Sequence, residues 1–177
     1  RIEDILDEKG DEIFKYADSI AVEFDVDVPV LKRAISLAEK HGKEVYAVVS
    51  NMSIAMERRD LLHHIACLVC NIEEAGLLFS EEYEGVAPDE MSDILFTKIS
   101  QAKIPAMVVT MGSEGAVYAS LDGTKGHCPA PKTEVRDTTG AGDAFFSGVT
   151  IGLTYGKTLD EACSIGTRLA NSVIVTD

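Results

Sequence analysis

The chain has 177 residues, of which 46% are hydrophobic, and its mean hydropathy is +0.07, so it can bury the core of one domain and lacks the composition of a disordered chain. Its net charge of −14 argues against a nucleic-acid or acidic membrane partner, because phosphate-rich surfaces are bound through an excess of lysine and arginine. With no run of roughly 20 apolar residues and no signal-peptide pattern in its first residues, we expect a cytoplasmic protein that acts on a small molecule.

Strand-like apolar runs alternate along the chain with amphipathic helical patterns. Strands are expected at residues 19–24, 44–49, 66–70 and 106–110, followed by a hairpin formed by residues 116–120 and 125–128. Helices are expected at 30–41, ending at Gly42, and from Pro88 to about Lys103, and a capping box at 158–161 opens the last helix. This order predicts an α/β fold with a doubly wound, mostly parallel sheet and helices on both faces. In such a fold the ligand site lies at the carboxyl ends of the strands.

The four cysteines do not show the spacing of a disulfide-rich secreted domain, so free thiols are expected. Cys67 and Cys70 form a C-x-x-C pattern preceded by His63 and His64, which would also suit a zinc or redox site. The two residues between the cysteines are apolar, however, and belong to a strand-like run. We therefore favour buried core cysteines, since a buried thiol behaves as a small hydrophobe.

Residues 137–148 form the most informative segment, a glycine turn that carries one acid into an apolar, helix-like run. The backbone amides of Gly140, Ala141 and Gly142 can approach an anion closely, and the positive end of the following helix adds to the field. Asp143 stands at the edge of this turn, where it could take a proton from an attacking hydroxyl. The segment therefore predicts phosphoryl transfer, with these four residues as the catalytic group.

Two other interpretations of this segment are open. It could be an ordinary helix start with Asp137 or Thr138 as N-cap. A dinucleotide-binding fingerprint is a further alternative, but Phe145 stands where its third glycine would be, and no strong strand leads into the turn. The sequence has no P-loop pattern, so a nucleotide would be held in another way.

Three motifs in order resemble those of the ribokinase-like, or PfkB, carbohydrate kinase family. Residues 137–143 match its Asp-Thr-x-Gly-Ala-Gly-Asp signature, residues 71–74 its Asn-x-x-Glu element, and residues 110–115 its nucleotide loop. The resemblance implies a ribokinase-like fold and ATP-dependent phosphorylation of a hydroxyl group on a sugar or nucleoside. It also implies Mg²⁺ as cofactor, and in several family members a monovalent cation such as K⁺.

The resemblance assigns a role to each motif residue. Asn71 would contact the nucleotide phosphates and Glu74 would organise Mg²⁺ through water, although the two could also be a plain capping pair. The loop residues would contact the nucleotide, although a tight turn alone would also explain their glycines. These loop residues are Thr110, Gly112, Ser113 and Gly115.

Near the carboxyl terminus, the resemblance places Thr167 at a position that lines the adenine pocket in family members. It also matches four residues to positions where several members hold a monovalent cation, largely by carbonyl oxygens. These are Asp137, Thr139, Val173 and Thr176.

The chain resembles only the C-terminal portion of such a kinase, so residues 1–177 are expected to be its nucleotide-binding and catalytic part. The Gly-Gly sugar-binding signature and the lid of these kinases have no counterpart in the sequence. The Gly-Ala turn that family members usually have after the position of Asp177 has none either. We expect a fragment, inactive by itself, of an enzyme that is a homodimer at full length. A hypothesis from another class is a non-catalytic nucleotide-binding or regulatory module.

Overall fold

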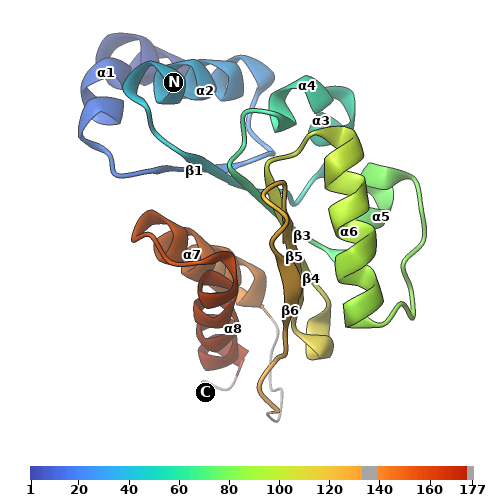
Figure 1. The fold of residues 1–177 in the computed structure, drawn as a ribbon. Coiled ribbons are helices and arrows are strands. Elements are labelled where there is room, and N and C mark those ends of the chain that lie inside the picture. Colours follow the sequence, from blue (N-terminus) through green and yellow to red (C-terminus); the bar gives the residue numbers. More distant parts are fainter. Residues whose placement is uncertain (133–138, 175–177) are drawn as a thin grey trace.

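A single mixed sheet runs through the molecule (Figure 1). The structure is a computed structural model, and it describes residues 1–132 and 139–174. Strands β1 to β4 are mutually parallel, and β5 and β6 continue the sheet in antiparallel fashion in the order β1-β2-β3-β4-β5-β6. The strands are β1 (Ile20–Glu23), β2 (Val45–Val48), β3 (Cys67–Asn71), β4 (Ala106–Thr110), β5 (Ala116–Ser120) and β6 (Lys125–Cys128).

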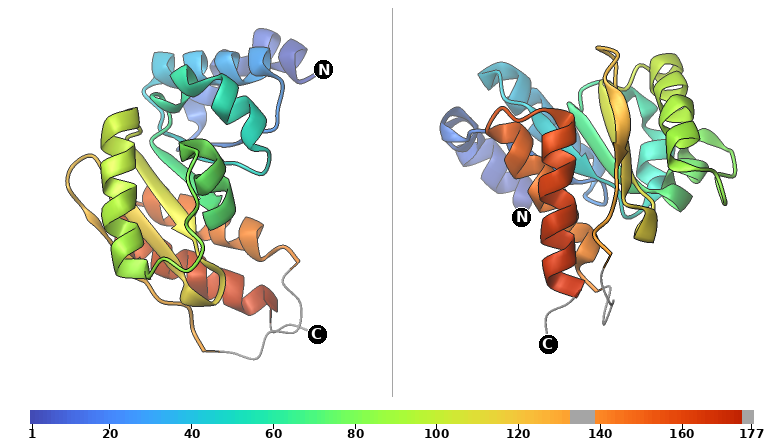
Figure 2. Two further views of the ribbon diagram at one scale, coloured as in Figure 1. Left: turned by 90° about the vertical axis from the view of Figure 1, so that its right-hand side faces the viewer. Right: turned by 60° about the horizontal axis from the view of Figure 1, so that its bottom comes forward.

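Helices cover both faces of the sheet, as Figures 1 and 2 show. The helices of one face share a core with alternate strand residues such as Leu68 and Met107, and those of the other face pack on Val69 and Val108. The first group comprises α1 (Ile2–Tyr16), α2 (Val28–His41), α3 (Met52–Glu57), α4 (Arg59–Leu62), α5 (Ile72–Phe79) and α6 (Pro88–Ala102), and the second comprises α7 (Ala141–Thr154) and α8 (Leu159–Ile174). The predicted α/β class is confirmed.

Local sequence signals set several helix ends. Helix α2 begins with a proline in its first turn and ends at Gly42, whose φ of 62° lies in the left-handed region that glycine tolerates. The predicted capping box opens α8: the Thr158 amide donates to Glu161 Oε2 at 2.9 Å, and the Glu161 amide donates to Thr158 Oγ1 at 3.2 Å. These bonds pair amides at the start of α8 that lack a partner within the helix.

Helices α7 and α8 pack unusually closely because glycines form their contact. A Cβ atom added to Gly148 would lie 2.7 Å from Gly166 Cα, and one added to Gly152 would lie 2.9 Å from Ala162 Cα. A Cβ on Gly166 would in turn meet the backbone oxygen of Phe145 at 2.8 Å. This close approach fixes the start of α7 beside the second half of α8.

The cysteines are buried, as expected. Cys67 and Cys70 are 1% and 3% exposed, and burial raises the pKa of the Cys67 thiol to about 12. His63 binds the Lys103 carbonyl oxygen through Nδ1 at 3.0 Å, and His64 binds a Glu39 carboxylate. Among the described residues no group of three metal-ligating side chains is present, so this part of the chain shows a core and not a zinc site.

No helix among the described residues has both the length and the apolar character that crossing a membrane requires.

Candidate active site

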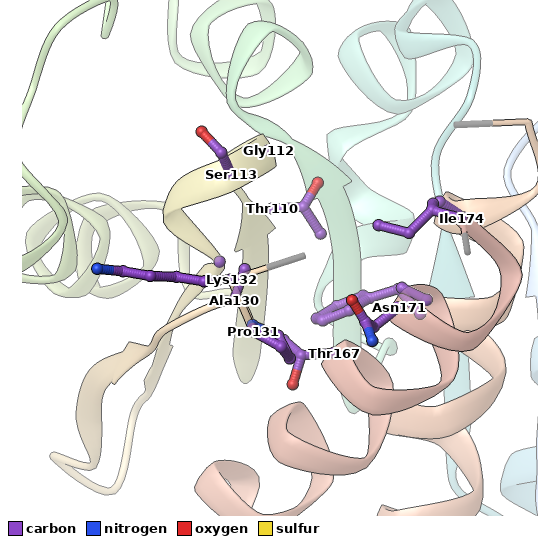
Figure 3. A pocket seen from close by; sticks show the side chains of 14 residues that line it. Thr110, Gly112, Ser113, Ala130, Pro131, Lys132, Thr167, Asn171 and Ile174 are labelled. Carbon is purple, nitrogen blue, oxygen red and sulfur yellow. The ribbon is translucent and has the colours of Figure 1, made fainter. Parts of the chain in front are cut away.

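A cavity of about 540 Å³ opens at the carboxyl end of β4 (Figure 3). Its walls come from the turn after β4, the segment after β6, the start of α7 and the last turns of α8. Seven residues predicted from the sequence line it: Thr110, Gly112, Ser113, Gly115, Ala141, Gly142 and Thr167. Segments separated by up to about sixty residues thus meet at the edge of the sheet where the topology predicts a ligand site.

The turn after β4 is held by its own backbone. A short 3₁₀ helix, η1 (Gly112–Glu114), is followed by Gly115, and the Met111 amide donates to the Gly115 carbonyl oxygen at 2.8 Å. Gly115 has a φ of 94°, and an added Cβ would lie 2.1 Å from the Cys128 carbonyl oxygen. Gly112 also has a positive φ of 57°, but an added Cβ there would meet none of the described residues within 4 Å. The fold itself therefore requires glycine at 115, whereas at 112 only the backbone conformation favours it.

The second glycine turn leads into α7. Gly140 is the N-cap with a φ of 77°, and its carbonyl oxygen accepts the Ala144 amide at 3.0 Å. Ala141 and Gly142 already belong to the helix, so the left-handed position of this turn is Gly140 and not Gly142. Among the residues that the structure describes, an added Cβ on Gly142 would meet nothing within 4 Å. The helix therefore presents bare backbone and the positive end of its dipole to the cavity.

Asp143 lies in the first turn of α7 with its side chain exposed, one residue beyond the two that line the cavity. Its position at the helix start brings the carboxylate close to backbone amides that carry partial positive charge. The structure thus places a carboxylate at the rim of the cavity and not in its wall.

Asn71 and Glu74 form a reciprocal capping box at the start of α5. The Asn71 amide donates to Glu74 Oε2 at 2.7 Å, and the Glu74 amide donates to Asn71 Oδ1 at 2.8 Å. Partial burial raises the pKa of the Glu74 carboxyl, against the lowering effect of the Asn71 amide. The two residues therefore form the capping pair that the sequence also allows. Asn71 Nδ2 and Glu74 Oε1 take no part in the capping box. Asn71 is the register partner of Thr110, which lines the cavity.

The residues near the end of α8 are partly described. Thr167 is 8% exposed, and its hydroxyl donates to the Ser164 carbonyl oxygen at 3.1 Å. An added Cβ on Gly140 would lie 3.8 Å from Val173 Cγ1, so the end of α8 lies beside the turn that holds Thr139. The other two residues of the predicted cation site, Asp137 and Thr176, lie outside the described residues.

Sequence reasoning missed half of the cavity wall. The missed residues are Ala130, Pro131, Lys132, Phe145, Ala170, Asn171 and Ile174. Three of them follow Thr167 along one face of α8 at intervals of three, four and seven, a spacing that could have identified them. The segment 130–132 carries no such signal, because its place in the wall results from its close contact with Gly115.

The chain is similar in sequence and in fold to known kinases. It matches the pfkB family carbohydrate kinase over residues 8–176, and it belongs to that family. The fold is that of ribokinase: the structure of Arabidopsis thaliana ribokinase complexed with ribose and ATP superposes with a TM-score of 0.84 at 21% identity, covering 96% of this chain and 54% of that one. An adenosine kinase from Sinorhizobium meliloti gives a TM-score of 0.77 at 24% identity, covering 94% of this chain and 51% of that one.

Curated relatives are kinases of nucleosides and sugars. A guanosine-inosine kinase of Exiguobacterium acetylicum is 34% identical over 160 residues, which are 90% of this chain and 52% of the relative. A ribokinase of Schizosaccharomyces pombe is 25% identical over 150 residues, which are 84% of this chain and 46% of the relative. The chain therefore spans about half the length of the curated relatives it matches.

Proposed function

We propose that this chain is the nucleotide-binding and catalytic part of a kinase that transfers a phosphoryl group from ATP to a hydroxyl of a nucleoside or sugar. The observation that carries the proposal is the cavity itself, which joins the turn at 110–115 to the start of α7. Its wall combines bare backbone, a helix N-terminus and apolar side chains, the combination that suits a phosphate at one end and a base at the other.

The start of α7 would perform the transfer. In our proposal the amides of Gly140, Ala141 and Gly142 stabilise the negative charge that develops on the transferred group. Asp143 accepts the proton of the acceptor hydroxyl as its oxygen attacks the γ-phosphorus, the bond from that phosphorus to the leaving oxygen breaks, and ADP departs. The exposed position of Asp143 at the cavity rim supports this role, because a base must reach an acceptor that lies outside the nucleotide pocket.

Glu74 and Asn71 would hold Mg²⁺ and the phosphates. Mg²⁺ keeps several waters and is usually held by one or two carboxylates together with substrate phosphates, so a single acidic side chain fits it. Glu74 retains one carboxylate oxygen, and Asn71 its amide nitrogen, beyond the capping box. The bound ion would neutralise charge on the phosphate oxygens.

A monovalent cation such as K⁺ would lie beside the anion-binding turn. Asp137, Thr139, Val173 and Thr176 are its proposed ligands, largely through carbonyl oxygens. The contact between the Gly140 position and the Val173 side chain supports this grouping, since it brings the end of α8 to the turn.

Among acceptors, we favour a nucleoside. The support is the 34% identity to a guanosine-inosine kinase, compared with 25% to a ribokinase. A sugar remains the second candidate class, since both kinds of kinase share the fold.

The test uses a polypeptide of the relatives' full length that contains this sequence. ADP release is measured with ATP, with and without Mg²⁺, across purine nucleosides, pyrimidine nucleosides and sugars. We expect Mg²⁺-dependent turnover with at least one nucleoside. Nucleotide binding without turnover on any acceptor would instead favour a binding or regulatory module and overturn the catalytic proposal.

A further inference from the structure

His127 on β6 makes a hydrogen bond to the turn after β4 without lining the cavity. Its Nε2 atom lies 2.5 Å from the Glu114 carbonyl oxygen, and because a carbonyl oxygen can only accept, Nε2 carries the hydrogen. Among the residues that the structure describes, this is the one side-chain hydrogen bond that reaches residues 111–115 from another element. The imidazole therefore contacts the turn and not the space that the turn encloses.

The β5–β6 hairpin determines the side from which His127 reaches the turn. His127 is the register partner of Val117, and Val117 belongs to the core that the sheet shares with α6. Register partners in an antiparallel pair project from the same face of the sheet. The cavity wall is completed on the opposite face, by α7 and α8. His127 thus supports the turn from the side away from the cavity.

The bond fixes one peptide unit of a turn that is otherwise held only by local bonds. The Glu114 amide donates to the Met111 carbonyl oxygen at 3.1 Å, and the Gly115 amide donates to the Gly112 carbonyl oxygen at 3.1 Å. The Glu114 carbonyl and the Gly115 amide belong to one planar unit, so His127 holds the end that points out of the turn. Because Gly112 and Gly115 are conformationally permissive, this outer contact removes freedom that the turn would otherwise have.

We propose that His127 is a positioning residue, which holds the turn in the conformation that places Gly112 and Ser113 in the cavity wall. A turn that is ordered before binding does not lose this conformational freedom when the ligand arrives, so the contact raises affinity without touching the ligand. The inference rests on the proposed nucleotide function of the cavity.

The test removes the donor and then restores it. His127→Phe keeps a ring but has no donor, and His127→Gln offers an amide nitrogen in place of Nε2. In the 177-residue chain, ATP affinity is measured by ligand-observed NMR, and hydrogen exchange is measured at the Gly115 amide. In His127→Phe we expect about five- to tenfold weaker ATP binding and about tenfold faster exchange, the effect of one lost hydrogen bond. His127→Gln should return both to within about threefold of the wild type.

His63→Phe is the matched control. His63 also binds a backbone carbonyl oxygen, that of Lys103 at 3.0 Å, but it does not line the cavity or contact the turn. This variant should keep the wild-type ATP affinity and the wild-type exchange at Gly115. A contribution of His127 to stability alone would lower Tm, measured by circular dichroism, without changing affinity in the folded chain.

Unchanged exchange at Gly115 in folded His127→Phe would overturn the inference, and so would faster exchange with unchanged ATP affinity. Failure of His127→Gln to restore either quantity would also overturn it, because the hydrogen bond would then not be the cause. Should His127→Phe not fold, the wild-type ring decides: a neutral imidazole with its proton on Nδ1, read from nitrogen-15 shifts, would overturn the inference. If the wild-type chain binds no ATP, the nucleotide proposal falls, whereas exchange at Gly115 still decides whether His127 holds the turn.

Discussion

Two glycine turns line the same cavity, and their glycines have different surroundings. At Gly115 an added Cβ would lie 2.1 Å from the Cys128 carbonyl oxygen and 2.6 Å from the Ala130 nitrogen, so the fold leaves no space for a side chain. At Gly142 an added Cβ would meet no atom from another part of the described chain within 4 Å. Glycine at 115 is therefore explained by the protein alone, whereas the described residues give no steric reason for glycine at 142, where we propose that a phosphate approaches the backbone.

A glycine in a motif can be needed by the fold or by the site, and the sequence does not distinguish these two cases. Both turns contain glycines with positive φ, Gly112 and Gly115 in one and Gly140 in the other. The distances from an added Cβ atom to its neighbours distinguish a glycine that the fold requires from one that leaves space at the site. Substitutions at the two turns should therefore divide into losses of stability and losses of function.

The largest effect is expected from Asp143→Asn in a full-length kinase that contains this chain. The amide keeps the size of the side chain but cannot accept the proton of the acceptor hydroxyl. Removing a general base lowers the rate by about 10²- to 10⁴-fold. We expect kcat to fall by this factor while nucleotide affinity stays within a few fold, as measured by steady-state kinetics and equilibrium titration. An unchanged kcat would remove Asp143 from the proposed mechanism.

Gly115→Ala should cause the largest loss of stability. Its φ of 94° and ψ of −132° suit glycine almost alone, and the new methyl group would overlap the backbone after β6. We expect unfolding to become easier by about 3 kcal/mol, which lowers Tm by about 10 °C in a chain of this size. Thermal unfolding followed by circular dichroism measures it. A Tm within a degree of the wild type would show that the turn can relax, and the contrast with Gly142 would disappear.

Gly142→Val is the matched counterpart and should show the reverse pattern. Position 142 is helical, so valine changes the stability by less than about 1 kcal/mol. Its branched side chain would occupy the space beside the cavity and weaken nucleotide binding by about tenfold or more. NMR titration with ATP and a thermal melt of the same sample separate the two effects. A strongly lowered Tm with unchanged affinity would assign this glycine to the fold.

The sequence predicts this molecule best where local signals are strong. The bounds of β4, β5 and β6 agree to the residue, because apolar runs and the Asp122-Gly123 turn mark them clearly. Helix α1 was not predicted as an element: its buried side, with Gly10 and Phe14, is recognisable only once it packs on α2. Long-range packing of this kind has no signature within a short window of sequence.

The cavity shows the same division. Its loop and turn residues belong to short motifs and were predicted, although their chemical roles stay predictions. The wall at 130–132 and Asn171 were not, because they come together where β6 ends against Gly115 and where α8 packs on α7. Motifs thus indicate what the site does, and tertiary packing decides what fits into it.

The smallest effect concerns the capping box at the start of α5. Glu74→Gln keeps an oxygen that can accept the Asn71 amide, so the free energy of unfolding at neutral pH should change by less than about 1 kcal/mol. Because burial raises the pKa of the Glu74 carboxyl in the folded chain, its protonated form stabilises the fold at low pH. That contribution is lost as pH rises through the folded pKa. The Gln variant should lack this loss, which urea unfolding between pH 4 and pH 7 can measure.

The same variant distinguishes the two alternatives for Glu74, which differ in the response to Mg²⁺ and not in stability. If Glu74 also holds the ion, Glu74→Gln should abolish the gain in nucleotide affinity that Mg²⁺ gives the wild type. Asn71→Ala is the control for the cap, since it removes the Oδ1 acceptor and should lower stability by about 1 kcal/mol. A Mg²⁺ response that survives Glu74→Gln undiminished would leave this residue with its capping role only, and would place it with Gly115 among the residues that serve the fold.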